Sequence, residues 1–169
     1  QMCIRDSANT SGEKNTAIGG ASLTDNTTGN KNTALGYDAG SNISTGNENT
    51  TLGQNAASTL TTGSYNILLG DDSDVNASGA SNQIVIGHGA TGHGDNIAVI
   101  GNTDNTAWHP ADDNGVDLGS SSYEFKDVYV DGVTYTDALG FGTTAMTLPT
   151  ADGSANQMLK TDGSGALSW

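Results

Sequence analysis

The sequence predicts an all-β protein, a parallel β-roll or β-solenoid of about six coils followed by β-hairpin modules. The first observation is a period, because a glycine recurs every 17 residues at Gly19, Gly36, Gly53, Gly70 and Gly87. The second is that each glycine closes a short segment of the form Asn-x-x-aliphatic-Gly or a close variant. The third is composition, with 24 glycines and only two prolines in 169 residues. A fixed period of this length indicates identical coils stacked on one another.

The repeated segments are the expected strands. They read NTAIG (15–19), NTALG (32–36), NTTLG (49–53), NILLG (66–70), QIVIG (83–87) and, after only 14 residues, IAVIG (97–101). Parallel strands stack about 4.8 Å apart, so residues at one position of successive coils form a column of like side chains. We therefore expect an asparagine ladder from Asn15, Asn32, Asn49 and Asn66, and tight turns at Gly29, Gly46 and Gly63.

Alternation along each strand separates two faces. The column before each turn glycine is always aliphatic, and we expect it to form the structural ladder inside the coil: Ile18, Leu35, Leu52, Leu69, Ile86 and Ile100. The middle column is small at first and apolar from the fourth coil onward. Leu68, Val85 and Val99 are therefore expected at a seam between chains. On this assignment Leu52→Asp damages the coil more than Leu68→Asp does.

Four segments organise the chain. Residues 1–7 (QMCIRDS) resemble a translated sequencing adapter and are set aside as an artefact, together with the only cysteine. Residues 8–101 form the repeat region, 102–115 a linker, and 116–169 a β-hairpin shaft or connector that we expect to be truncated at its C-terminus. One hairpin is expected where 123–130 and 133–135 alternate around Asp131-Gly132, a dipeptide that suits a type I′ turn. A second pairs 158–160 with 166–169.

Composition and motifs exclude several classes of function. The formal net charge is -14, and outside the adapter-like segment the only basic residues are Lys14, Lys31, Lys126 and Lys160, which disfavours nucleic-acid binding. No apolar run approaches the roughly 18 residues of a membrane span, so no membrane insertion is expected. We find no nucleophile elbow, phosphate loop or zinc motif, and we expect neither an enzyme nor a cofactor.

Two histidines in a glycine-rich stretch are weak metal candidates. His88 and His93 could hold a metal ion, although a glycine-rich turn with exposed histidines is the simpler interpretation. The run 71–74 (DDSD) lacks the spaced oxygens and the glycine of a calcium loop, and is expected to be an acidic turn facing solvent. If any surface of this chain binds a ligand, we expect it at His88, His93, Asp95 or Trp108.

Residues 11–101, with the run NTAIG and TTGNKNTALGYDAGSNISTGNENTTLG, resemble the head repeats of trimeric autotransporter adhesins. They are more similar still to repeats of bacteriophage tail-fibre proteins. The segments VDLGSSSY, YVDG and LPTADGSANQMLKTDGSGALSW are similar to stretches that follow such repeats in phage fibres. The resemblance implies a left-handed parallel β-roll assembled as a homotrimer on a virion or a cell surface. The period of 17 is longer than the usual adhesin repeat, which favours phage.

Three functions follow as expectations. The first is a structural and adhesive segment of a trimeric viral tail fibre, a rigid spacer whose full-length protein contacts a host cell-surface receptor or glycan. The second is the head domain of a bacterial trimeric surface adhesin. The third is an ice-binding solenoid, which needs a flat double row of threonines; the candidate rows are Thr27/Ser44/Thr61 and Thr28/Thr45/Thr62.

Overall fold

The computed structural model describes residues 8–111, 115–134, 138–141, 144–147, 149, 154, 157–164 and 166–168, so the adapter-like segment lies outside the described residues. The chain divides into two compact units, Gln1–His109 and Pro110–Trp169. Throughout the described ranges every regular element is a strand. Accordingly, this part of the chain contains no helix that is long and apolar enough to cross a membrane.

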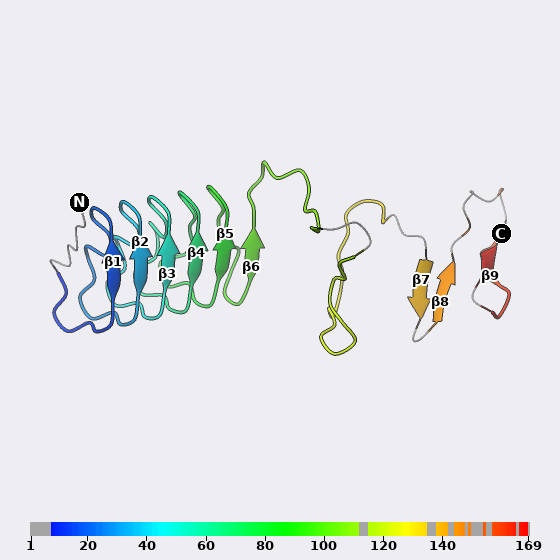
Figure 1. The fold of residues 1–169 in the computed structure, drawn as a ribbon, viewed down its shortest axis with the longest axis horizontal. Helices are drawn as coiled ribbons and strands as arrows, with labels where there is room; N and C mark the ends of the chain where they lie inside the picture. Colours follow the sequence, from blue (N-terminus) through cyan, green and yellow to red (C-terminus); the bar gives the residue numbers. More distant parts are fainter. Residues whose placement is uncertain are drawn as a thin grey trace. The chain divides into compact units, whose positions relative to one another are not determined.

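The first unit is a β-solenoid whose six strands form one parallel sheet in the order of the sequence. The strands are β1 (Thr16–Ile18), β2 (Thr33–Leu35), β3 (Thr50–Leu52), β4 (Ile67–Leu69), β5 (Ile84–Ile86) and β6 (Ala98–Ile100). Figure 1 shows them side by side, with the chain looping round once between neighbours. Thr16 pairs with Thr33 and Ile84 with Ala98, so the predicted steps of 17 residues and, at the end, 14 residues are confirmed.

Left-handed backbone positions turn each coil back to the sheet. Among the described residues, twelve that are not glycine take φ between 48° and 65°. They recur in columns, for example at Lys31, Glu48 and Tyr65, just before successive strands. Each such residue costs roughly 1–2 kcal/mol relative to right-handed backbone. Hydrogen bonds between coils hold the strained positions, since Lys31 N donates to Glu13 O at 2.9 Å and Glu48 N to Asn30 O at 2.9 Å.

The core is a thin layer enclosed by each coil. The middle residue of each strand from β1 to β5 points inward and is buried: Ala17, Ala34, Thr51, Leu68 and Val85. Leu23, Ile43 and Leu60 pack into the same interior from the opposite wall. The space between the walls is small. A Cβ added to Gly40 would lie 2.9 Å from Ile43 Cδ1 and 3.2 Å from Thr51 Oγ1.

The predicted assignment of the two strand faces is therefore wrong. The aliphatic column lies on the outside of the coil, where Ile18 and Leu35 are each 43% exposed and Leu52 is 42% exposed. Leu68 and Val85, predicted at a seam between chains, are fully buried inside the coil, and Val99 is half-buried. The sequence pattern predicts the larger aliphatic side chains inside the coil. The interior is narrow, and the column with smaller side chains, such as Ala17, Ala34 and Thr51, fills it instead.

The predicted asparagine ladder is confirmed. The backbone N of Asn32, Asn49, Asn66 and Gln83 donates to the side-chain Oδ1 of the asparagine one coil earlier, at 2.9 to 3.0 Å. Each asparagine Nδ2 also donates to the carbonyl of residue 29, 46, 63 or 80, at 2.7 to 3.0 Å. Asn32, Asn49 and Asn66 are fully buried, so this ladder satisfies polar groups that water does not reach.

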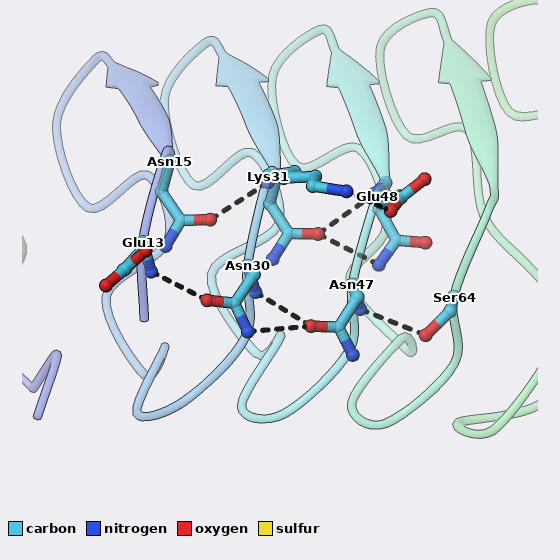
Figure 2. Close-up of polar contacts among 9 residues, drawn as sticks. Glu13, Asn15, Asn30, Lys31, Asn47, Glu48 and Ser64 are labelled. Carbon is cyan, nitrogen blue, oxygen red and sulfur yellow. Dashed lines mark hydrogen bonds and ion pairs between the residues drawn. The ribbon is translucent and has the colours of Figure 1, made fainter. Parts of the chain in front are cut away.

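A second amide ladder, which we did not predict, runs with the opposite direction of donation. Glu13 N donates to Asn30 Oδ1 at 2.8 Å, Asn30 N to Asn47 Oδ1 at 2.9 Å, and Asn47 N to Ser64 Oγ at 3.0 Å. Figure 2 shows both ladders crossing successive coils. Each backbone N here donates to the following coil, whereas in the buried ladder it donates to the preceding one. Neighbouring coils are thus tied by side-chain amides at two places.

The buried amide ladder changes where the last coil is shortened. Gln83 replaces asparagine, and its Nε2 donates to Asn76 Oδ1 at 2.5 Å instead of to the next coil. Ile97 occupies the following ladder position, and its carbonyl accepts from Ile84 N at 3.2 Å. Beyond β6, Asn102 N donates to Asn105 Oδ1 at 2.7 Å, and Asn105 N to Asn102 O at 3.2 Å. The buried amide ladder therefore ends at the fifth coil, and a tight turn follows the sixth strand.

Thr51 contains a buried hydroxyl without a hydrogen-bond partner. The residue is 1% exposed, and its Oγ1 has no partner. We expect Thr51→Val to raise the free energy of unfolding by about 1 kcal/mol, because a methyl group removes an unsatisfied polar atom. Urea unfolding measures the change. Thr27→Val is the control, since Thr27 Oγ1 donates to Ser44 O at 3.0 Å, and this variant should lose stability. Equal losses in both variants would contradict the prediction.

The second unit contains two short antiparallel pairs. β7 (Ala138–Phe141) pairs with β8 (Thr144–Thr147), a pairing that we did not predict. β9 (Lys160–Thr161) pairs with β10 (Leu167–Ser168), inside the segment of the second expected hairpin. The Asp162 carboxylate accepts hydrogen bonds from Ser164 N at 2.8 Å and Ala166 N at 3.1 Å. These bonds lower the pKa of Asp162, and they fix the turn between the two strands.

The hairpin predicted around Asp131-Gly132 is not formed. Residues 123–134 contain no strand; the only ladder contact in this stretch is the isolated bridge between Ser120 and Tyr123. Neither Asp131 nor Gly132 takes the positive φ that a type I′ turn requires. Tyr129 and Val133 are exposed, so pairing here would bury little apolar surface. The end of the predicted second strand, 135, lies outside the described residues.

Candidate functional site

The outward face of the six-stranded sheet is a regular surface of the solenoid. Two columns point outward: Thr16, Thr33, Thr50, Ile67, Ile84 and Ala98, and beside them Ile18, Leu35, Leu52, Leu69, Ile86 and Ile100. We call these twelve residues the outer face. Its threonines give way to isoleucine from β4 onward, where Ile67 and Ile84 are 38% and 39% exposed. The face contains no charged residue.

Folding of one chain leaves the outer face uncovered. The coil interior is filled from the other side of the same strands, and Ile18, Leu35, Leu52 and Ile100 of the aliphatic column stay 42% to 49% exposed. Contiguous apolar surface of this kind marks a site of interaction with another apolar surface. The column predicted as the structural ladder, from Ile18 to Ile100, is thus the strongest candidate for binding a partner, although the sequence placed it inside the coil.

The turn glycines allow the coils to approach closely. Gly19, Gly36, Gly53, Gly70 and Gly87 take φ between 135° and 142°, a conformation that other residues rarely adopt. A Cβ on Gly36 would lie 2.7 Å from the carbonyl carbon of Gly53 in the next coil. Glycine at this position therefore lets the strand ends of neighbouring coils stack closely beside the outer face.

A group of three metal-ligating side chains lies at the turn that follows β4 and β5. Asp71, Asp72 and His88 are exposed, and one ligand atom from each lies within 4.8 Å of the other two. His88 Nε2 is 4.0 Å from Asp71 Oδ2. Sequence reasoning considered the aspartates and the histidine separately. The repeat period could have joined them, because residues 71 and 88 are 17 apart and occupy one column.

The four residues predicted as a binding surface do not form one site. His93 is exposed and borders a cavity of about 390 Å³ at the end of the stack, lined also by Thr91 and Val99. Asp95 has a structural contact, since its Oδ1 accepts from Ser81 N at 2.8 Å. Trp108 is 77% exposed, and among the described residues neither it nor His93 belongs to the metal-ligating group around His88.

In one of the two rows needed for ice binding, side-chain hydroxyls already donate hydrogen bonds to backbone carbonyls of the next coil. Thr27 Oγ1 donates to Ser44 O at 3.0 Å, and Ser44 Oγ to Thr61 O at 3.2 Å. The neighbouring row, Thr28, Thr45 and Thr62, is exposed, whereas Thr27, Ser44 and Thr61 are half-buried. A single row of three hydroxyls is not the flat double row that this function needs.

One ion pair links the second and third coils. Lys31 Nζ lies 2.7 Å from Glu48 Oε1, and the hydrogen bond to Glu48 raises the pKa of Lys31. Both side chains are exposed, so the pair adds little to stability. Figure 2 shows it beside the amide ladders.

The outer face and the Asp71, Asp72 and His88 group are therefore the two candidate sites of the solenoid. The outer face can make apolar contacts but has no metal-binding or titratable side chains. The second site has two carboxylates and an imidazole, which are possible metal ligands. No protein-family model matches this chain, and no curated protein or solved structure matches it significantly.

Proposed function

We propose that this chain is a structural and adhesive segment of a trimeric viral tail fibre, and that it acts as a rigid spacer for host attachment. The observation that carries the proposal is the outer face, a regular apolar surface that a single chain leaves uncovered. The sequence resemblance of residues 11–101 to phage tail-fibre repeats supports the setting on a virion. On this proposal residues 116–169 are a connector to further parts of the fibre.

Rigidity follows from the bonds between coils. Sheet hydrogen bonds tie neighbouring coils from β1 to β6, and the two amide ladders add links among the first five coils. Six strands at about 4.8 Å per step extend over roughly 24 Å along the stack. No hinge of unpaired backbone interrupts the strands from β1 to β6. Such a stack transmits force and holds a fixed length, as a spacer must.

Copies of the same chain are the partners that we propose for the outer face. Each copy carries a formal charge of -14, so two chains repel one another over most of their surfaces. The outer face lacks charged residues, and it is therefore where copies can approach without repulsion. Three parallel stacks facing a common axis would bury the column from Ile18 to Ile100 along their full length.

Leu35→Asp tests the seam. Leu35 is exposed in the single chain, so the coil should keep its fold, but the carboxylate should separate the chains because a buried unpaired charge costs several kcal/mol. Light scattering is expected to report a trimer for the unmodified chain and a monomer for the variant. Thr45→Asp, at an exposed position away from the outer face, is the control and should remain trimeric. An unmodified chain that stays monomeric at high concentration would refute the seam.

Adsorption of intact particles tests the spacer role. We expect that the trimeric fragment, added in excess to host cells, leaves adsorption of the particle unchanged. The physical reason is that the coils lack the clustered aromatic and arginine side chains that usually anchor a binding site. Strong and saturable blocking would instead place receptor binding on this segment, as in the head of a bacterial surface adhesin.

A further inference from the structure

We infer that Asp71, Asp72 and His88 form a binding site for a divalent transition-metal ion. The site lies at the turn after β4 and β5 and joins two neighbouring coils. It is independent of the proposed function, because its residues do not belong to the outer face. The inference rests on three features: the spacing that the stack imposes, the orientation of the side chains, and the chemistry of the donor atoms.

The spacing is set by the coils and not by a flexible loop. Asp71 and His88 each follow a turn glycine, Gly70 and Gly87, so they occupy one column of the stack. Two bonds fix the step between their coils, since Gly87 N donates to Leu69 O at 2.8 Å and Gly89 N to Asp71 O at 2.9 Å. The two ligands are thus held about one strand spacing apart, roughly 4.8 Å between backbones.

Outer contacts orient the group. Asn55 Nδ2 donates to Asp72 Oδ1 at 2.8 Å, which directs the carboxylate and leaves its second oxygen for a metal ion. Asp72 itself takes φ of 54°, the left-handed conformation that Asp38 and Asn55 share in the same column. Asn102 Nδ2 donates to the His88 carbonyl at 2.8 Å and so anchors the backbone of the histidine. Hydrogen bonds to metal ligands of this kind raise affinity by holding the ligands in place.

The donor set selects the metal. One imidazole nitrogen and two carboxylate oxygens suit Zn²⁺, Co²⁺ or Ni²⁺, whereas Ca²⁺ and Mg²⁺ prefer oxygen ligands alone. Bonds of about 2.0–2.2 Å place neighbouring ligand atoms roughly 3–4 Å apart. The three ligand atoms lie within 4.8 Å of one another, so small rotations of exposed side chains suffice to close around an ion. Water completes the coordination on the exposed side.

A bound ion would join the fourth and fifth coils from outside the core. This is where the amide ladder changes, since Gln83 bonds Asn76 and the next ladder position is Ile97. Gln83 N still donates to Asn66 Oδ1 between these two coils, so the ion would add a second side-chain link beside the last one that the amide ladder makes. We therefore expect metal binding to raise the melting temperature of the solenoid.

Titration of the full chain with Zn²⁺ by calorimetry, and with Co²⁺ by visible absorption, tests the site. We expect one saturable site per chain, and a loss of affinity of about tenfold or more in His88→Gln and in Asp72→Asn. Two matched controls should bind like the unmodified chain. His93→Gln removes an exposed histidine outside the group, and Asp38→Asn removes an aspartate in the Asp72 column two coils earlier.

Two results would overturn the inference. The first is the absence of saturable Zn²⁺ or Co²⁺ binding in a chain whose circular dichroism shows the folded solenoid. The second is an equal loss of affinity in His93→Gln and His88→Gln, which would indicate diffuse attraction to the acidic surface. In either case the close approach of His88 and Asp71 would be an ion pair alone.

Discussion

Replacement of Asn49 by leucine is expected to lower the free energy of unfolding by roughly 3–6 kcal/mol, enough to unfold a marginally stable stack. Leucine has a similar size but cannot form hydrogen bonds. Asn49 Nδ2 donates to Asn32 Oδ1 at 3.1 Å and to Gly63 O at 3.0 Å. Its Oδ1 accepts from both the backbone N and the Nδ2 of Asn66, each at 3.0 Å. Asn32, Asn49 and Asn66 are all fully buried, so in the variant the polar groups that lose a hydrogen bond to residue 49 cannot bond to water instead.

Urea unfolding followed by circular dichroism measures the loss. Asn42→Leu is the matched control, because the Asn42 side chain is exposed and makes one hydrogen bond, from its Nδ2 to Ser58 O at 2.6 Å. We expect the control to change the free energy of unfolding by less than about 1 kcal/mol. Comparable losses in both variants would show that the buried ladder does not hold the coils together.

Gly53→Ala is expected to be nearly as damaging, at roughly 3 kcal/mol or more. Gly53 takes φ of 138°, which side chains rarely allow. The added methyl group would overlap the Gly70 carbonyl oxygen and lie 2.5 Å from its carbon and 2.8 Å from Asp71 N. These are backbone atoms of the next coil, so relief requires the third and fourth coils to move apart and lose hydrogen bonds between β3 and β4.

Thermal unfolding checks this prediction against Gly79→Ala. A methyl group on Gly79 meets only Thr62 Oγ1, at an ordinary 3.5 Å, and Gly79 does not have a positive φ. The control should therefore leave the melting temperature unchanged or raise it slightly, because alanine restricts the unfolded chain. Similar melting temperatures for the two variants would mean that coil stacking tolerates a side chain at the turn.

The repeat period accounts for most of what the sequence predicts. A fixed spacing of glycine and asparagine determines register, and register determines which residues share a column, so the strands and the Asn15–Asn66 ladder follow. Which face of a three-residue strand points inward depends on the width of the coil. That width is set by Leu23, Ile43 and Leu60 on the far wall, and no pattern within the strand reveals it.

Local sequence patterns predict structure less well where no contact with residues distant in the sequence stabilises it. The alternation around Asp131-Gly132 is typical of a hairpin, yet pairing also requires apolar surface to pack against, and Tyr129 remains exposed. The site at Asp71 and His88 was missed for a different reason. Its residues are unremarkable one by one, and only the stacking of coils brings them together. In both cases contacts between residues distant in the sequence decide the outcome, and no local pattern contains them.

The shortened sixth coil ends the solenoid on the side of β6. A stack of parallel coils can in principle grow without limit, because each end presents unpaired backbone groups to another strand. After β6 the chain leaves the period, and the turn from Asn102 to Asn105 closes on itself through hydrogen bonds at 2.7 and 3.2 Å. The length of the solenoid is therefore proportional to the number of repeats, and each repeat adds about 4.8 Å along the stack. The sixth strand is the last one of this sheet, so a further repeat is accommodated within the array and not after the turn at Asn102.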